Sequence, residues 1–192
     1  MNFFRKKKRV NAPSGVLLVS SGGLGDTVLF SIIINRFYTI AKSDEKITLL
    51  LRSDSKKVSF LFHEKISIYT VNYKEFRKKR NYRSKIEKEL YLLNFRVVVS
   101  TDFLRHPKLD EAIIKACDAQ KTIAMEAHPW GKYNAELSRN RKFFNEIFES
   151  DPIHFNKILR WCNFAGSITS EKYQLPKLLI EKGLVPKSNK YN

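Results

Sequence analysis

Several residue types and patterns that mark particular protein classes are scarce or missing in this sequence of 192 residues. Cysteine occurs twice, at Cys117 and Cys162, with neither metal-site spacing nor a disulfide framework, which fits a reducing compartment. The four histidines are scattered and form no H-x-x-x-H pattern, which argues against a zinc site. The basic N-terminus is followed by no apolar signal-peptide core, and no run of about 18 apolar residues occurs. These absences favour a cytoplasmic protein without a transmembrane helix.

Acidic residues are also scarce relative to basic ones. The sequence has 19 Asp and Glu against 36 Lys and Arg, which gives a formal net charge of +17. A surface with such an excess of cations prefers anionic partners, such as a phosphorylated glycolipid, a nucleic acid or an anionic membrane face. The basic opening of residues 1–9 fits either contact with an anionic leaflet or a solvated tail. The apolar fraction of 43% and the length favour one folded domain.

The most informative stretch is formed by residues 16–29. It opens with four apolar residues, Val16–Val19, which are typical of a strand buried on both faces. Three glycines follow closely, at Gly22, Gly23 and Gly25. They permit a tight turn with positive φ and allow another group to approach the bare backbone. Asp26 or Thr27 is suited to cap the apolar run of residues 28–40 as a helix, so the stretch predicts the opening of a βαβ unit.

Further apolar runs of strand length alternate with segments of helical spacing. Strands are expected at residues 47–51, 66–71, 96–100 and 121–125, with a short edge strand within 142–149. Helices are expected at 57–62, in the second half of 73–95, at 108–117 and from 151 to Gly166, and residues 126–141 are expected to form a surface loop. This alternation predicts an α/β fold, a Rossmann-like parallel sheet flanked by helices. We expect a basic tail at 1–13, the domain at 14–166 and a linker or tail at 167–192.

Ligands of such sheets bind beyond the carboxyl ends of the strands, so the residues that follow the strands are candidate binding residues. They are Ser20, Ser21, Gly22, Gly23 and Gly25 after the first strand, Arg52, Lys56 and Lys57 after the second, and Arg105 and His106 after the fourth. Guanidinium groups can hold phosphates or carboxylates bidentately. Each cation is equally well explained as a solvated surface charge, and the serines and glycines as plain turn formers.

Two glycine-loop motifs can be compared with this turn. A P-loop needs a lysine after its glycines, whereas this sequence has Asp26, which would repel phosphates. A dinucleotide fingerprint needs a third glycine where this sequence has Val28. Arg52, in place of the usual acid, could accept the phosphate of NADP, so an NADP-binding protein stays open. Nucleic-acid binding rests on charge alone, because no recognisable motif supports it.

Residues 16–29, a hydrophobic strand followed by S-S-G-G-L-G-D-T-V-L, resemble the start of the ADP-heptose:lipopolysaccharide heptosyltransferases, glycosyltransferase family 9. Residues 97–102 are similar to that family's strand before an acidic loop, and residues 154–166 to its helix before the interdomain linker. The resemblance covers most of residues 14–190 and implies the GT-B layout of two Rossmann-like domains facing a cleft. The sequence ends at Asn192, where the second domain would begin. We therefore expect the acceptor-binding half, truncated or part of a split enzyme and inactive alone.

The resemblance also implies a function, an inverting glycosyltransferase of lipopolysaccharide core synthesis. Asp26 would take the proton of the acceptor hydroxyl, although spacing alone favours a helix cap. The implied acceptor is an acidic glycolipid, the lipopolysaccharide inner core, held by Arg52, Arg105 and His106 at the inner face of the cytoplasmic membrane. The implied donor is an ADP-heptose-like nucleotide-sugar that requires the second domain, on the same or on a separate chain. The resemblance implies no metal, no further cofactor and no nucleic-acid partner.

Overall fold

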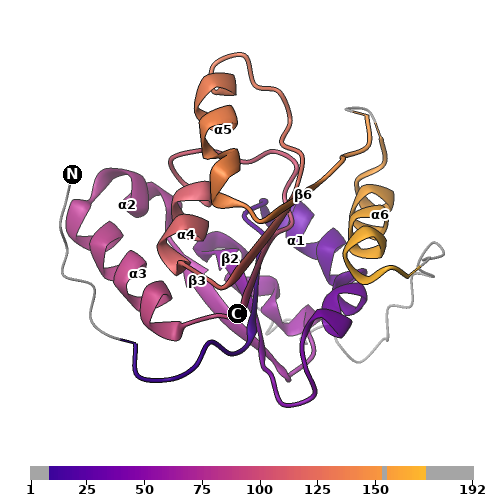
Figure 1. Cartoon of the computed structure of the whole chain (residues 1–192), viewed down its shortest axis with the longest axis horizontal. Coiled ribbons are helices and arrows are strands. Elements are labelled where there is room, and N and C mark those ends of the chain that lie inside the picture. Colours follow the sequence, from indigo (N-terminus) through magenta and orange to yellow (C-terminus); the bar gives the residue numbers. More distant parts are fainter. Residues whose placement is uncertain (1–8, 153–154, 172–192) are drawn as a thin grey trace, which may run out of the picture.

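The centre of the molecule is a sheet of six parallel strands in the order β3-β2-β1-β4-β5-β6 (Figure 1). The computed structural model describes residues 9–152 and 155–171. The strands are β1 (Val16–Val19), β2 (Ile47–Arg52), β3 (Ile66–Val71), β4 (Val97–Ser100), β5 (Lys121–Met125) and β6 (Glu146–Phe148). An order that runs outward from β1 in both directions is the doubly wound, Rossmann-like order. The predicted fold class is therefore confirmed.

Helices cover both faces of this sheet, and Figure 1 shows the two groups on opposite sides of it. One group contains α1 (Leu24–Ser31), η1 (Ile34–Ile40), η2 (Ser53–Leu61) and α6 (Lys157–Thr169). The other contains α2 (Tyr73–Lys78), α3 (Arg80–Leu93) and α4 (Asp110–Cys117). The connection from β5 to β6 holds α5 (Asn134–Asn140) and η3 (Arg141–Phe143), and α5 projects at the top of Figure 1.

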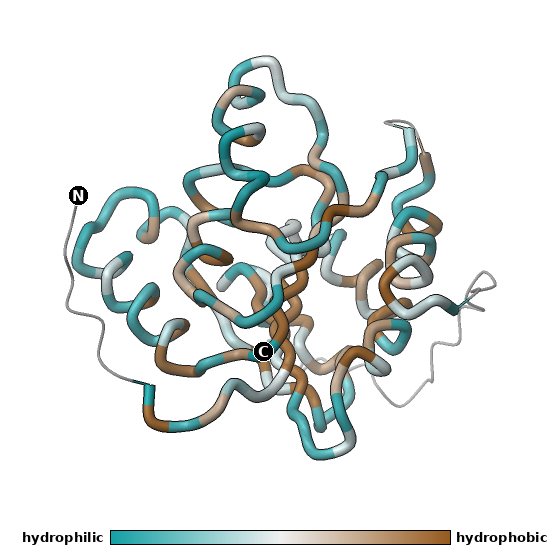
Figure 2. Tube along the Cα trace, viewed as in Figure 1, coloured by the Kyte–Doolittle hydropathy of each residue, from teal (hydrophilic) through white to brown (hydrophobic). Residues whose placement is uncertain are grey.

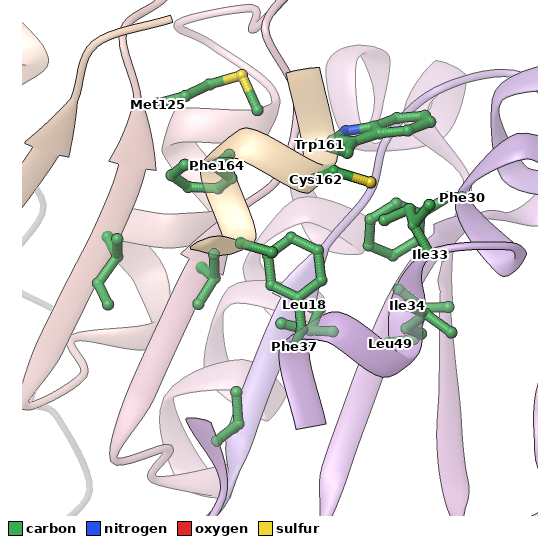
Figure 3. Close-up of a cluster of buried hydrophobic side chains, with 14 of the residues drawn as sticks. Leu18, Phe30, Ile33, Ile34, Phe37, Leu49, Met125, Trp161, Cys162 and Phe164 are labelled. Atoms are coloured by element: carbon green, nitrogen blue, oxygen red, sulfur yellow. The ribbon is translucent and has the colours of Figure 1, made fainter. Parts of the chain in front are cut away.

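The hydrophobic core is divided by the sheet, because successive side chains of a strand point to opposite faces. Leu18 packs with Phe30 and Trp161 on the α1/α6 side, where Trp161 and Phe30 meet edge to face at 5.2 Å (Figure 3). Leu17 packs in the second cluster with Leu90 of α3. The strands at the centre of the molecule are mostly hydrophobic, whereas α3 and α5 are largely hydrophilic (Figure 2). Both faces of β1 are covered by hydrophobic side chains, so the polar residues that follow it lie beyond its carboxyl end.

The first helix begins earlier than predicted. It starts at Leu24, with Gly23 as the N-cap residue and no side-chain cap, and the apolar run of 28–40 is shared between α1 and η1. The backbone N–H of Thr27 donates to Gly23 O at 2.9 Å, which closes the first helical turn. Asp26 and Thr27 lie inside the helix, so the prediction that one of them is the cap is wrong.

Further elements differ from the prediction. The first half of 73–95, expected to be a loop, forms α2 and the start of α3, and the helix expected at 57–62 is η2, which begins at Ser53. Residues 126–141 were expected to be a loop but contain α5, whose one buried residue, Leu137, leaves no apolar periodicity to detect. Helix α6 continues three residues past Gly166 to Thr169, because Ile168 still packs against the core. The predicted helix start at 151 is likewise later in the structure, since α6 begins at Lys157 with Asn156 as its N-cap.

The two predicted terminal segments fall largely outside the described residues. Of the basic tail, residues 1–8 are outside, while Arg9 is docked and donates to the carbonyls of Tyr91, Cys117 and Asp118. Of the predicted segment 167–192, residues 167–169 belong to α6 and residues 172–192 are outside. Within the described part of the chain, no helix has the length and apolarity needed to cross a bilayer.

Candidate functional site

The candidate site lies at the switch point of the sheet, between the carboxyl ends of β1 and β4. Val19 is in register with Ser100, and the N–H of Thr101 donates to Val19 O at 3.0 Å. From β1 the chain winds one way through the sheet, and from β4 it winds the other way. Open α/β sheets bind their ligands in the crevice formed at such a reversal. The residues after β1 and β4 therefore stand where the fold provides a binding crevice.

The glycine turn after β1 works by close approach rather than by positive φ. Among the described glycines, positive φ occurs at Gly15 and not at Gly22, Gly23 or Gly25, so that part of the prediction is wrong. A Cβ on Gly22 would lie 2.5 Å from the Cβ of Asp26 and 2.7 Å from its Oδ2. A Cβ on Gly23 or Gly25 would meet nothing within 4 Å. Gly22 thus lets the Asp26 side chain fold back over the turn.

Asp26 is paired with the first residue of α6. Nζ of Lys157 lies 2.6 Å from Oδ1 of Asp26, and each side chain is about 35% exposed. Oδ2 makes no hydrogen bond with a described residue. It is also not among the side-chain atoms that are both fully buried and without a partner, so it keeps some contact with solvent. The ammonium of Lys157 also lies 5.4 Å from the ring of Trp161, one turn along α6. Asp26 is therefore a fixed carboxylate with one oxygen open to a ligand.

Asp102, two residues beyond β4, is buried and holds the entry to the glycine turn. Its Oδ2 accepts hydrogen bonds from the backbone N–H of Ser21 at 2.5 Å and from the Ser21 hydroxyl at 2.8 Å. Burial, with the neighbouring Asp110 carboxyl, raises the pKa of Asp102 to about 6, although Ser21 and Lys157 oppose the rise. The conformation of the turn therefore depends on a carboxyl group that the sequence analysis did not select.

Oγ of Ser20 and Oγ of Ser100 are buried and lack a hydrogen-bond partner among the described residues. The hydroxyl of Tyr73 is also buried, and it interacts with the Asp110 carboxyl and with Ser21. Oδ2 of Asp110 accepts from the N–H of His106 at 2.7 Å. Burial, strengthened by the nearby Asp110, raises the pKa of Tyr73 well above its usual value.

The predicted cations after β2 face solvent at the same edge of the sheet. Arg52 is partly exposed, and its Nε and Nη2 donate to the two carboxylate oxygens of Asp54 at 3.2 and 2.7 Å. Lys56 and Lys57 are exposed on η2. These three residues make no hydrogen bond with Asp26 or its neighbours in the described structure. An anionic ligand that reaches Arg52 must compete with Asp54 for the guanidinium.

Arg105 and His106 do not behave as the surface charges that the sequence left open. Arg105 is 2% exposed, donates from Nε to Glu111 at 3.2 Å and from Nη1 to Met125 O at 2.5 Å. Burial lowers the pKa of Arg105, and Glu111 opposes that shift. The His106 ring lies 4.6 Å from the ring of Tyr133, and burial lowers its pKa. Both residues belong to the loop after β4 but are turned away from the glycine turn, toward β5 and α5.

The structure therefore gathers Ser20, Ser21 and Asp26 with two residues that were not predicted, Lys157 and Asp102. No local signal identifies Lys157, because the contact joins the first helix to the last one described. Asp102 stands in the acidic loop noted in the sequence, but its burial is decided by α4 and not by local pattern. No group of three or more His, Cys, Asp or Glu within the described ranges is placed to hold a metal ion.

Comparisons with known proteins support the fold of this site. No protein-family model and no curated protein matches the sequence. Among solved structures, Escherichia coli heptosyltransferase WaaC with ADP matches at 15% identity and a TM-score of 0.59, over 88% of this chain and 51% of that chain. The same enzyme with ADP-2-deoxy-2-fluoro heptose matches at 15% identity and a TM-score of 0.59, over 85% of this chain and 50% of that chain. A family 9 glycosyl transferase from Veillonella parvula matches at 13% identity and a TM-score of 0.62, over 88% of this chain and 45% of that chain. The chain thus spans about half the length of these proteins and shares the Rossmann-like fold of that half.

Proposed function

We propose that this chain is the acceptor-binding half of an inverting glycosyltransferase of the heptosyltransferase type, with Asp26 as its general base. The observation that carries this proposal is the free Oδ2 of Asp26 on a glycine turn at the switch point of the sheet. The likeness in fold to solved heptosyltransferases over about half their length supports it. The proposed acceptor is the acidic inner core of lipopolysaccharide, reached from the cytoplasmic face of the inner membrane.

In the proposed reaction, Oδ2 of Asp26 accepts the proton of an acceptor hydroxyl while that oxygen attacks the anomeric carbon of the donor sugar. The new C–O bond forms as the bond to the nucleotide diphosphate breaks, so the anomeric configuration inverts. Lys157 keeps Oδ1 occupied, which aims the other oxygen at the crevice. The nucleotide diphosphate needs positive charge for its departure, and such charge stabilisation is usually the largest catalytic contribution. A donor domain, on this protein or on a partner, has to provide it.

The NADP-binding alternative fits the site less well. A pyrophosphate at the start of α1 would need bare backbone N–H groups and no negative charge nearby. Here the Asp26 carboxylate lies over Gly22, in the first turn of that helix. Arg52, which would take the NADP phosphate, is already paired with Asp54. No specific contact favours nucleic-acid binding over the general excess of positive charge.

The test is a transfer assay on the protein combined with a donor-binding domain, with ADP-heptose as donor and deacylated inner core as acceptor. Loss of a general base typically costs about 10²- to 10⁴-fold in rate, so Asp26→Asn is expected to lose that much activity. Asp44→Asn, the same change at an exposed site before β2, is the matched control and is expected to keep its activity. Thermal unfolding of both variants checks that each is folded. An Asp26→Asn protein that still transfers sugar at the normal rate contradicts the assignment.

A further inference from the structure

A cavity of about 280 Å³ opens at the carboxyl end of β5, outside the glycine-turn site. We call it the β5 pocket, and its polar lining consists of Arg105, Glu126, His128, Asn134, Ser138 and Arg141. Arg105 comes from the β4–α4 loop, and the other five come from the single connection between β5 and β6, which includes α5 and η3. Ligand pockets usually span about 300 to 1,000 Å³, so this cavity suits one small ligand.

The floor of the β5 pocket is an arginine whose orientation is fixed from behind. Arg105 is 2% exposed, and two of its nitrogens are bound to Glu111 and Met125 O. The second oxygen of Glu111 accepts from Nδ2 of Asn140 at 2.7 Å, and the Phe144 ring lies 5.1 Å from the guanidinium carbon. Nη2 has no hydrogen-bond partner among the described residues. It is also not among the fully buried atoms without a partner, so it keeps some accessible surface. The buried guanidinium thus presents one pre-oriented donor edge to the pocket.

The rim of the β5 pocket carries a second arginine in a contact that a ligand can exchange. Arg141 Nη1 pairs with Glu126 Oε2, and their side chains are 52% and 44% exposed. Nδ1 of His128 is buried without a partner among the described residues, and the ring packs 5.2 Å from that of Phe103. Each arginine is matched by one carboxylate, Arg105 by the buried Glu111 behind it and Arg141 by Glu126 at the rim, so an incoming anion has to compete with Glu126 for Arg141. Asn134, Ser138 and Glu126 add the amide, hydroxyl and carboxylate groups that commonly bind sugar hydroxyls.

We propose that the β5 pocket binds a monosaccharide unit that carries a carboxylate or a phosphate. The anion contacts Nη2 of Arg105 and displaces Glu126 from Arg141, because guanidinium groups bind both kinds of anion with charge-assisted hydrogen bonds. In the terms of the proposed function, on which this assignment rests, the pocket recognises an acidic sugar of the acceptor. β5 is two strand spacings from β1, so the pocket lies roughly 10 Å across the sheet edge from the glycine turn. An oligosaccharide acceptor can bridge that span.

The experiment titrates the full chain with sugars and follows binding by calorimetry and by amide NMR shifts. The probes are galacturonate, glucose 6-phosphate, glucose and inorganic phosphate. Binding is expected for at least one acidic sugar, with neutral glucose and phosphate alone at least tenfold weaker. Arg141→Ala is expected to weaken the binding of the acidic sugar at least tenfold. Arg139→Ala is the matched control, since Arg139 is exposed on the same segment, bonds to Ala135 O and to no other described residue, and does not line the pocket.

Which acidic sugar binds separates the two anions, since a carboxylate site favours galacturonate and a phosphate site favours glucose 6-phosphate. The assignment is overturned if neither acidic sugar binds, if phosphate alone binds as tightly, or if Arg139→Ala weakens binding as much as Arg141→Ala. Asp26→Asn is expected to bind the acidic sugar normally. If the acidic sugar binds to the β5 pocket as expected but Asp26→Asn still transfers sugar, only the proposed function is refuted. If Asp26 is essential for transfer but no acidic sugar binds, only the assignment of the β5 pocket is refuted.

Discussion

Two aspartates follow the neighbouring strands β1 and β4, and they stand in opposite environments. Asp26 is about one-third exposed, pairs with Lys157 through Oδ1 and leaves Oδ2 without a partner. Asp102 is 6% exposed, and its Oδ2 is held twice by Ser21. The first carboxylate rests on Gly22 of the turn and is partly exposed, whereas the second is buried beside Asp110 of α4.

This difference separates two roles that a carboxylate can have at a sheet edge. A group that reacts with a ligand must keep one oxygen reachable, which Asp26 does. A group that fixes a backbone segment must be engaged by it, and Asp102 binds both the N–H and the hydroxyl of Ser21 at the entry to the glycine turn. Asp102 is therefore a positioning residue for the turn that carries Asp26. The following variants test whether the two regions are as different as they look.

The largest effect on stability is expected for Asp102→Asn. An aspartate in an unfolded chain titrates near pH 3.9, roughly, whereas burial raises the pKa of Asp102 to about 6. Between these values the native protein binds more protons than the unfolded chain, so this group lowers stability as the pH rises. The loss amounts to about 3 kcal/mol and is complete above pH 7. Asp102→Asn cannot titrate, so its stability relative to the wild type should rise by that amount from pH 4 to pH 7.

The measurement is chemical unfolding of both proteins at several pH values, read as the difference between the two curves, in which the other titrating groups cancel. Asp44→Asn is the control for the substitution itself, because Asp44 is exposed in the turn before β2. A flat curve for Asp102→Asn would show that Asp102 behaves as an exposed acid. The contrast between the two aspartates would then disappear.

The next effect is expected at the glycines that shape the turn. In Gly22→Ala the new Cβ would lie 2.5 Å from the Cβ of Asp26, so the start of α1 has to shift. Overpacking of this kind costs about 1–3 kcal/mol, and thermal unfolding measures it. Gly25→Ala is the matched control, because nothing lies within 4 Å of its Cβ and alanine favours a helix more than glycine. Equal losses in both variants would mean that Asp26 does not rest on Gly22.

The sequence was sufficient for the sheet and insufficient for the short helices. Runs such as Val16–Val19 are apolar on both faces, which leaves a buried parallel strand as the simplest structure. Helix α5 buries one apolar residue, Leu137, and a single anchor produces no period to detect. Helix α6 passes Gly166 because Ile168 reaches the core, a tertiary contact that outweighs the low helix propensity of glycine.

The site was predictable only where its chemistry is local. The glycine turn and Asp26 lie within five residues, so they were found together. The burial of Arg105 depends on Glu111 and the Phe144 ring, which come from α4 and the chain before β6. Contacts of this range leave no mark on the residues near Arg105, and an arginine in a loop after a strand is simplest to explain as solvated. The β5 pocket was missed for the same reason.

The smallest effect, and the one that links the two regions, is expected for Lys157→Gln. Both partners of the Lys157–Asp26 pair are about 35% exposed, and such surface pairs contribute roughly 0–1 kcal/mol, so unfolding should change little. Lys108→Gln removes a comparable pair with Glu136 and is the control. The ammonium of Lys157 also lowers the pKa of Asp102, so carboxyl NMR should show that pKa rising in Lys157→Gln and unchanged in Lys108→Gln. If the Asp102 titration does not move, Lys157 acts on Asp26 alone, and the two carboxylates are independent of each other.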